Sequence, residues 1–177
     1  MGESLVKFLG ERGPEGHLFR VDMRLRPEGL HGPLARSLES FIHYLNSQAR
    51  DWERLAYLKA RVVSGPVRLA QILYRVMAEF VFAGLDAQRI VSEVQDLKLR
   101  IDREVLNSDL YRREVKRGYG GIREIEFVIT AMQIIHGYNH HALRIRNTFL
   151  AIQRLLETHI LDAEAAEFYQ AAYSFLR

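Results

Sequence analysis

Residues 17–27 contain a run in which apolar and charged side chains alternate. The apolar side chains are Phe19, Val21, Met23 and Leu25, and the charged ones are Arg20, Asp22, Arg24 and Arg26. A period of two with aromatic and β-branched members is typical of a strand that buries one face. The sequence therefore predicts a strand here, and Pro27 ends it because proline cannot donate to a sheet.

The charged face of this strand has two interpretations. It can be an ordinary solvated face of an antiparallel strand, which is common. It can also bind phosphate, with Asp22 holding a divalent cation and the arginines holding phosphate oxygens. The alternation alone leaves both open.

Most of the remaining chain has apolar residues at the spacing of amphipathic helices. Helices are predicted over residues 37–46, 48–63, 67–82, 87–107, from Ile122 to about Ile135, 147–157 and 162–177. Residues 67–82 are apolar on most faces, which predicts a central, well-buried helix. The fold class is therefore mainly α, a helical bundle preceded by a short β-hairpin or strand.

Composition excludes several classes of function. The chain has no cysteine, so it has neither disulfides nor thiolate chemistry. No apolar run approaches the roughly 20 residues of a membrane span, and the first residues do not resemble a signal peptide. The basic cluster Arg112, Arg113, Lys116 and Arg117 indicates a local anion site. It does not favour nucleic acid, because only Tyr111 and Tyr119 lie near it for base stacking.

Three local motifs have a plain interpretation beside a functional one. Lys59 and Arg61 lie near a helix end, where basic residues are favoured by the helix dipole. The glycines of residues 118–121 can cradle phosphate before a helix, but no P-loop lysine follows, so a packing turn is favoured. His136 and His140 have the spacing of a metal pair, but Gly137 indicates that the helix has ended, and no third ligand is near.

Three segments together carry a family resemblance. They are residues 19–27 (Phe-Arg-Val-Asp-Met-Arg-Leu-Arg-Pro) with Gly-Pro-Leu at 32–34, residues 50–61 (Arg-Asp-Trp-Glu-Arg-Leu-Ala-Tyr-Leu-Lys-Ala-Arg), and residues 120–127 (Gly-Gly-Ile-Arg-Glu-Ile-Glu-Phe). In order and spacing they resemble the glutamine synthetase adenylyltransferase (glutamate–ammonia-ligase adenylyltransferase) family. Its members have two nucleotidyltransferase halves. The Asp-Trp-Glu-Arg and Gly-Gly-Ile-Arg-Glu-Ile-Glu-Phe motifs of this chain more closely resemble the N-terminal, adenylyl-removing half.

The resemblance implies a domain organisation and a set of site residues. Residues 1–36 are expected to be the C-terminal remnant of a nucleotidyltransferase catalytic domain, and residues 37–177 a helical substrate or regulatory domain truncated at its C-terminus. Asp22 matches the third metal-binding carboxylate of such enzymes and would be catalytic. The residues expected at the nucleotide or its phosphates are Arg24, Arg26, Lys59 and Arg61. The family-signature residues without an assigned role are Gly120, Gly121, Arg123, Glu124 and Glu126.

The resemblance also implies a reaction and partners. One half of such an enzyme transfers AMP from ATP to a tyrosine of glutamine synthetase, and the other removes it by phosphorolysis, releasing ADP. Mg²⁺ is the expected cofactor, because two metal ions held by three carboxylates stabilise the attacking and leaving oxygens. Glutamine synthetase and a PII-type signal protein are the expected partners, in the cytoplasm, without nucleic acid or membrane.

The sequence departs from the family pattern in one respect. No Gly-Ser followed by Asp-x-Asp precedes Asp22, so the first two metal ligands are missing. We therefore expect the chain alone to be inactive. The alternative is that the helical part from Ser37 onward docks glutamine synthetase or a PII-type regulator and performs no chemistry.

Overall fold

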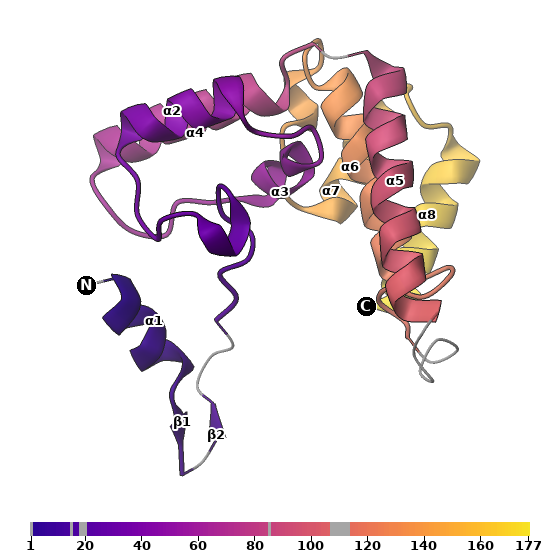
Figure 1. The fold of residues 1–177 in the computed structure, drawn as a ribbon. Helices are drawn as coiled ribbons and strands as arrows, with labels where there is room; N and C mark the ends of the chain where they lie inside the picture. The colour runs from indigo at the N-terminus through magenta and orange to yellow at the C-terminus, as the bar shows by residue number, and fades with distance from the viewer. Residues whose placement is uncertain (1, 15, 18–20, 85, 107–113) are drawn as a thin grey trace. The chain divides into compact units, whose positions relative to one another are not determined.

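The structure is a computed structural model that describes residues 2–14, 16–17, 21–84, 86–106 and 114–177. Within these ranges the chain is mainly α-helical, which confirms the fold class expected from the sequence (Figure 1). Short 3-10 turns occupy Gly29–His31 and His141–Leu143. The helices are α1 Gly2–Gly10, α2 Leu38–Ser47, α3 Glu53–Lys59, α4 Val67–Val81, α5 Ala87–Leu106, α6 Ile122–His136, α7 Thr148–Glu157 and α8 Ala163–Leu176.

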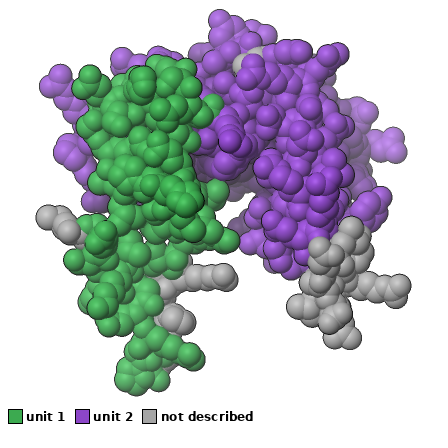
Figure 2. Space-filling view, in the orientation of Figure 1, with its two compact units in different colours: residues 1–49 green, residues 50–177 purple. Residues whose placement is uncertain are grey.

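The chain divides into two compact units, residues Met1–Ala49 and Arg50–Arg177 (Figure 2). Helix α2 is therefore counted with the N-terminal unit. The boundary predicted between residues 36 and 37 concerned the end of a catalytic domain, which chain contacts alone do not test, and it stays a prediction.

In the N-terminal unit, the strand predicted over residues 17–27 is wrong for the part that the structure describes. The strands are β1 Arg12–Gly13 and β2 Gly16–His17, an antiparallel pair in which Arg12 is in register with His17. Residues 21–24 have no regular secondary structure, and a turn follows them, so Asp22 does not lie on a strand. Phe19 and Arg20 lie outside the described residues.

Local hydrogen bonds explain this difference. The Asp22 carboxylate accepts a hydrogen bond from the backbone N–H of Arg24 at 3.0 Å, so the side chain takes a donor that a sheet would need. The Arg26 guanidinium donates to the carbonyls of Met23, Leu30 and Gly32 and folds the segment back on itself. Alternation alone cannot anticipate either bond.

Helix α2 begins at a side-chain cap and is tied to the turn before it. The Ser37 hydroxyl accepts a hydrogen bond from the Ser40 N–H at 3.1 Å, which confirms the expected N-cap. Tyr44 is buried, and its hydroxyl accepts from the Glu28 N–H at 3.3 Å. The Arg36 guanidinium pairs with the Glu28 carboxylate at 2.6 Å and lies over the Tyr44 ring.

Helix α6 is the central helix of the C-terminal unit and packs against α3, α5, α7 and α8. It contributes Ile125 and Ile129 to an apolar cluster with α7 and α8. It contributes Ala131 and Ile134 to a second cluster with α3, the end of α4 and α5. Because α6 supplies both clusters, it joins the helices on its two sides into one unit.

The central position predicted for residues 67–82 is therefore wrong. In α4 only Val81 is fully buried, whereas Val67 is 73% exposed and Leu69 is 39% exposed. An apolar sequence shows that a helix can be buried, but the number of neighbouring helices decides whether it is. None of the helices that the structure describes is long and apolar enough to cross a membrane.

Candidate functional site

Asp22 and Arg24 form an exposed ion pair in the N-terminal unit. The Arg24 Nη2 donates to Asp22 Oδ2 at 2.6 Å, and Arg24 Nε lies 3.0 and 3.1 Å from the two carboxylate oxygens. The side chains remain accessible, at 45% for Asp22 and 69% for Arg24. Asp22 and Arg24 thus lie together at the surface in a segment that is not a strand, and their catalytic and phosphate-binding roles stay predictions.

Arg26 has a different environment from Arg24. Its guanidinium is bound to three backbone carbonyls, with distances of 3.0–3.2 Å, and holds the loop of residues 23–32 closed. Gly32 completes the loop, because a Cβ there would lie 2.1 Å from the Pro27 carbonyl oxygen. In this conformation Arg26 supports the loop next to Asp22, and its contact with phosphate stays a prediction.

The residues present do not by themselves fit a magnesium site. Mg²⁺ is held in proteins by carboxylates together with water or substrate phosphate. Asp22 supplies one carboxylate, and the described parts of the chain contain no group of three or more histidine, aspartate or glutamate side chains that could hold a metal. A site that includes Asp22 needs ligands from outside the described residues.

Lys59 is the last residue of α3 and contacts a segment far away in the sequence. Its Nζ donates to the Arg146 carbonyl at 2.8 Å and to the Thr148 hydroxyl at 3.3 Å. Burial lowers the pKa of the Lys59 ammonium below its ordinary value, and the charge of Glu126 partly opposes that shift. Arg61, two residues later, is exposed.

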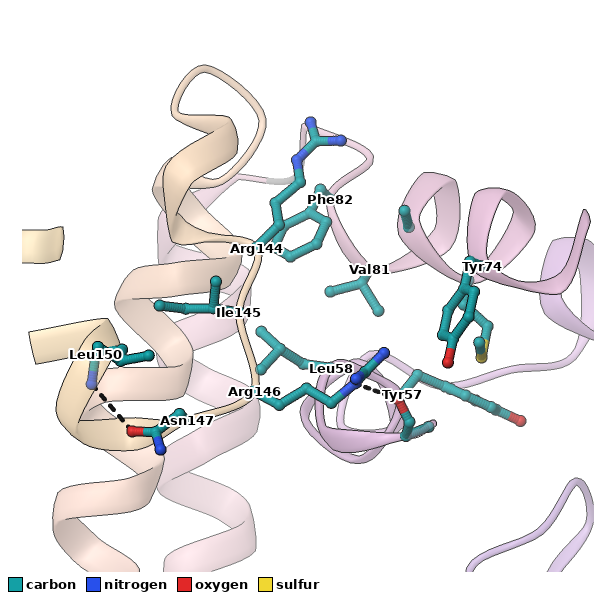
Figure 3. A pocket seen from close by; sticks show the side chains of 13 residues that line it. Tyr57, Leu58, Tyr74, Val81, Phe82, Arg144, Ile145, Arg146, Asn147 and Leu150 are labelled. Atoms are coloured by element: carbon teal, nitrogen blue, oxygen red, sulfur yellow. Dashed lines mark hydrogen bonds between the residues drawn. The ribbon is translucent and has the colours of Figure 1, made fainter. Parts of the chain in front are cut away.

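A pocket of about 540 Å³ lies beside this contact, between α3, α4 and residues 144–150 (Figure 3). Its apolar lining includes Leu58 and Val81, and its polar lining includes two arginines. Arg144 lies 4.9 Å from the centre of the Phe82 ring, and Arg146 lies 5.3 Å from that of Tyr74.

Neither arginine was named among the residues predicted from the sequence, and in the structure both donate to backbone carbonyls. Arg146 Nε donates to the Ala60 carbonyl at 2.7 Å, and Arg144 Nε donates to the Gly137 carbonyl at 2.8 Å. A signal was present, since basic residues flank Ile145 just before the cap of α7. The partners of these side chains cannot be read from that pattern.

The glycines before α6 form a packing turn, which confirms the interpretation favoured from the sequence. Gly120 has a positive φ of 72°, and a Cβ on Gly121 would lie 2.7 Å from the Val115 carbonyl oxygen. The N–H groups of Ile122 and Arg123 are bound to the carbonyls of Val115 and Lys116. These first N–H groups of α6 are therefore already satisfied within the chain.

Two of the other signature residues, Glu124 and Glu126, join α6 to neighbouring helices. Glu124 pairs with Lys98 of α5 at 2.6 Å. Glu126 accepts a hydrogen bond from the Tyr173 hydroxyl of α8 at 3.2 Å. The Arg123 guanidinium lies near the Phe127 ring, 5.9 Å from its centre. The signature residues thus make contacts within α6 and from α6 to α5 and α8.

Two charged motifs from the sequence analysis remain, the histidine pair His136 and His140 and the basic cluster of residues 112–117. Burial lowers the pKa of His136, and the nearby His140 lowers it further. Of the basic cluster, Arg117 pairs with Glu114 at 3.4 Å, whereas Tyr111, Arg112 and Arg113 lie outside the described residues.

Comparison with known sequences divides the chain into two matched parts. Residues 1–75 match the family described as glutamate-ammonia ligase adenylyltransferase. Residues 90–177 match the family described as GlnD PII-uridylyltransferase. The first match ends within α4, and the second begins within α5.

Individual relatives match the whole chain. Proteins named bifunctional glutamine synthetase adenylyltransferase/adenylyl-removing enzyme are 40% identical in Methylococcus capsulatus, 37% in Chromobacterium violaceum and 36% in Idiomarina loihiensis. Each alignment covers 100% of this chain and 19% of the relative, so the chain spans about a fifth of their length. Over its whole length the chain is therefore similar to one segment of the bifunctional glutamine synthetase adenylyltransferase/adenylyl-removing enzymes.

Proposed function

We propose that the chain is part of a nucleotidyltransferase that modifies glutamine synthetase and thereby regulates nitrogen assimilation. The complete protein transfers AMP from ATP to a tyrosine of glutamine synthetase and removes it by phosphorolysis, which releases ADP. The observation that carries this proposal is the similarity of all 177 residues to relatives named for both activities. The sequence motifs at residues 51–54 and 120–127 favour the adenylyl-removing half.

Within that function, Asp22 is proposed as a metal-binding carboxylate. Its accessibility in an irregular segment supports this role, and Arg24 beside it can neutralise phosphate oxygens. The proposed metal is Mg²⁺, and its further carboxylates would come from outside the described residues. Arg61 is proposed as the second phosphate contact, since it is exposed next to the fixed residue Lys59.

A second candidate function is favoured by the match of residues 90–177 to a different nucleotidyltransferase family. The two family names specify different protein substrates, glutamine synthetase and PII. A helical segment common to both can dock a protein, either glutamine synthetase or a PII-type regulator, without taking part in the chemistry.

Assays of the complete gene product test the proposed function. It is purified and incubated with glutamine synthetase, Mg²⁺ and labelled ATP, and adenylylated glutamine synthetase is incubated with inorganic phosphate in parallel. The proposed function requires labelling in the first reaction or ADP release in the second. Binding of glutamine synthetase in sedimentation, without either reaction, would contradict it and favour the docking module.

A further inference from the structure

Residues 60–62 follow the end of α3 at Lys59 without regular secondary structure, and residues 59–62 are held by side chains from two other parts of the chain. Ala60 has φ −67° and ψ 147°, so the helix has ended there. The Ala60 carbonyl accepts from Arg146 Nε at 2.7 Å. The Val62 N–H donates to the Tyr74 hydroxyl at 3.1 Å.

The bonds across this contact are reciprocal. Lys59 Nζ donates to the backbone carbonyl of Arg146, and Arg146 Nε donates to the backbone carbonyl of Ala60. Thr148 is buried and gives Lys59 a second acceptor. The Arg146 guanidinium also lies over the ring of Tyr74. We call these contacts of Tyr74, Arg146 and Thr148 with residues 59–62 the 59–62 clasp.

The clasp connects the two parts of the chain that match different families. Residues 59–62 and Tyr74 lie within the adenylyltransferase match, whereas Arg146 and Thr148 lie within the uridylyltransferase match. Two of the three donors of the Lys59 ammonium are used in the clasp. Through these two bonds Lys59 connects the two matched parts of the chain. Arg61, two residues later, remains exposed.

We propose that Arg146 and Thr148 are positioning residues that hold residues 59–61 in one conformation, so that Arg61 meets nucleotide phosphate in one geometry. This inference rests on the function proposed above. A flexible segment would have to be ordered whenever the nucleotide binds, and the clasp removes that entropic cost in advance.

The matched variants are Arg146→Ala and Arg144→Ala. Both remove an arginine that lies over an aromatic ring of the α4 region and donates through Nε to a carbonyl. Only Arg146 bonds residues 59–62, because Arg144 bonds Gly137 and Tyr138. Arg144→Ala therefore controls for general loss of packing.

Kinetics of the complete gene product test the positioning role. Arg146→Ala should raise the KM for ATP, or for phosphate in phosphorolysis, by about tenfold with kcat within about twofold. Arg146→Lys should recover part of the loss, since an ammonium can still reach a carbonyl. Arg144→Ala should leave KM unchanged. A fall in kcat at constant KM, or an equal rise in KM for Arg144→Ala, would overturn the proposal.

Hydrogen exchange tests the clasp without reference to activity. In Arg146→Ala the Val62 amide should exchange at least about tenfold faster, because Tyr74 loses the guanidinium that lies over its ring. Thr148→Val, which keeps the shape of the side chain, should have a smaller effect of the same sign, and Arg144→Ala none. Unchanged exchange in Arg146→Ala would refute the clasp. If the complete product catalyses neither reaction, the proposed function fails, and this exchange measurement alone decides the clasp.

Discussion

Two neighbouring glycines before α6 should respond differently to a methyl group. On Gly121 a Cβ would lie 2.7 Å from one carbonyl oxygen and 2.8 Å from another, whereas nothing lies within 4 Å of a Cβ on Gly120. We expect Gly121→Ala to lower the free energy of unfolding by about 2–3 kcal/mol through overpacking. Gly120→Ala should lower the free energy of unfolding by only about 1 kcal/mol, because the sole penalty is a non-glycine residue at a positive φ. Urea denaturation compares the two, and equal losses would contradict the packing turn.

The environment of His136 predicts a pH dependence of stability with a definite sign. Burial lowers the pKa of His136 below its ordinary value of 6.5, and the electrostatic interaction with His140 lowers it further. As the pH falls below 6.5, the unfolded chain takes up this proton first, so stability falls with pH until the folded pKa is passed. His140→Gln removes the nearby charge and should raise the pKa of His136 toward its ordinary value. Titration of the imidazole signals by NMR measures it, and a pKa of His136 at or above 6.5 would be inconsistent with the structure.

The start of α3 is stabilised by a buried ion pair. Asp51 and Arg54 are both buried and joined at 3.0 Å, and Arg54 lies over the Phe80 ring of α4. Arg89 of α5 also binds Asp51 but is 63% exposed. The pair therefore connects α3 with two other helices.

Removing one partner of that pair should be costly. Asp51→Asn leaves the buried Arg54 charge without its carboxylate partner. We therefore expect the free energy of unfolding to fall by about 3 kcal/mol. Arg89→Ala should cost less than about 1 kcal/mol, because its side chain is mostly in water. Thermal or urea unfolding compares them. A loss for Asp51→Asn no greater than that for Arg89→Ala would show that burial does not strengthen this pair.

The elements were predictable where the signal is local. Apolar periodicity predicted helix α5 over 87–107, and it is observed over Ala87–Leu106. The Ser37 cap is likewise a local bond. Periodicity does not specify neighbours, so it placed α4 at the centre of the bundle, where α6 lies. It also could not anticipate that Arg26 closes a loop in place of a strand.

The candidate site of the whole molecule was predictable only in part. Three short sequence motifs sufficed for the family resemblance, and the relatives extend the similarity over the entire chain. Asp22 and Arg24 are exposed, as the sequence predicted, but they pair with each other in an irregular segment and not on the face of a strand. The contact of Lys59 with Arg146 joins residues 87 positions apart, so no local pattern could predict it.

The proposed function is tested most directly by replacing Asp22 in the complete gene product. Asp22→Asn keeps the size of the side chain but removes its charge, while Glu39→Gln removes an exposed carboxylate from α2 as a control. Adenylylation and phosphorolytic deadenylylation of glutamine synthetase are assayed for each variant. We predict that Asp22→Asn lowers one of the two reactions by at least about a hundredfold, leaves the other intact and does not change the unfolding temperature. Loss of deadenylylation alone would place the chain in the adenylyl-removing half, and unchanged rates for both reactions would contradict the catalytic role of Asp22.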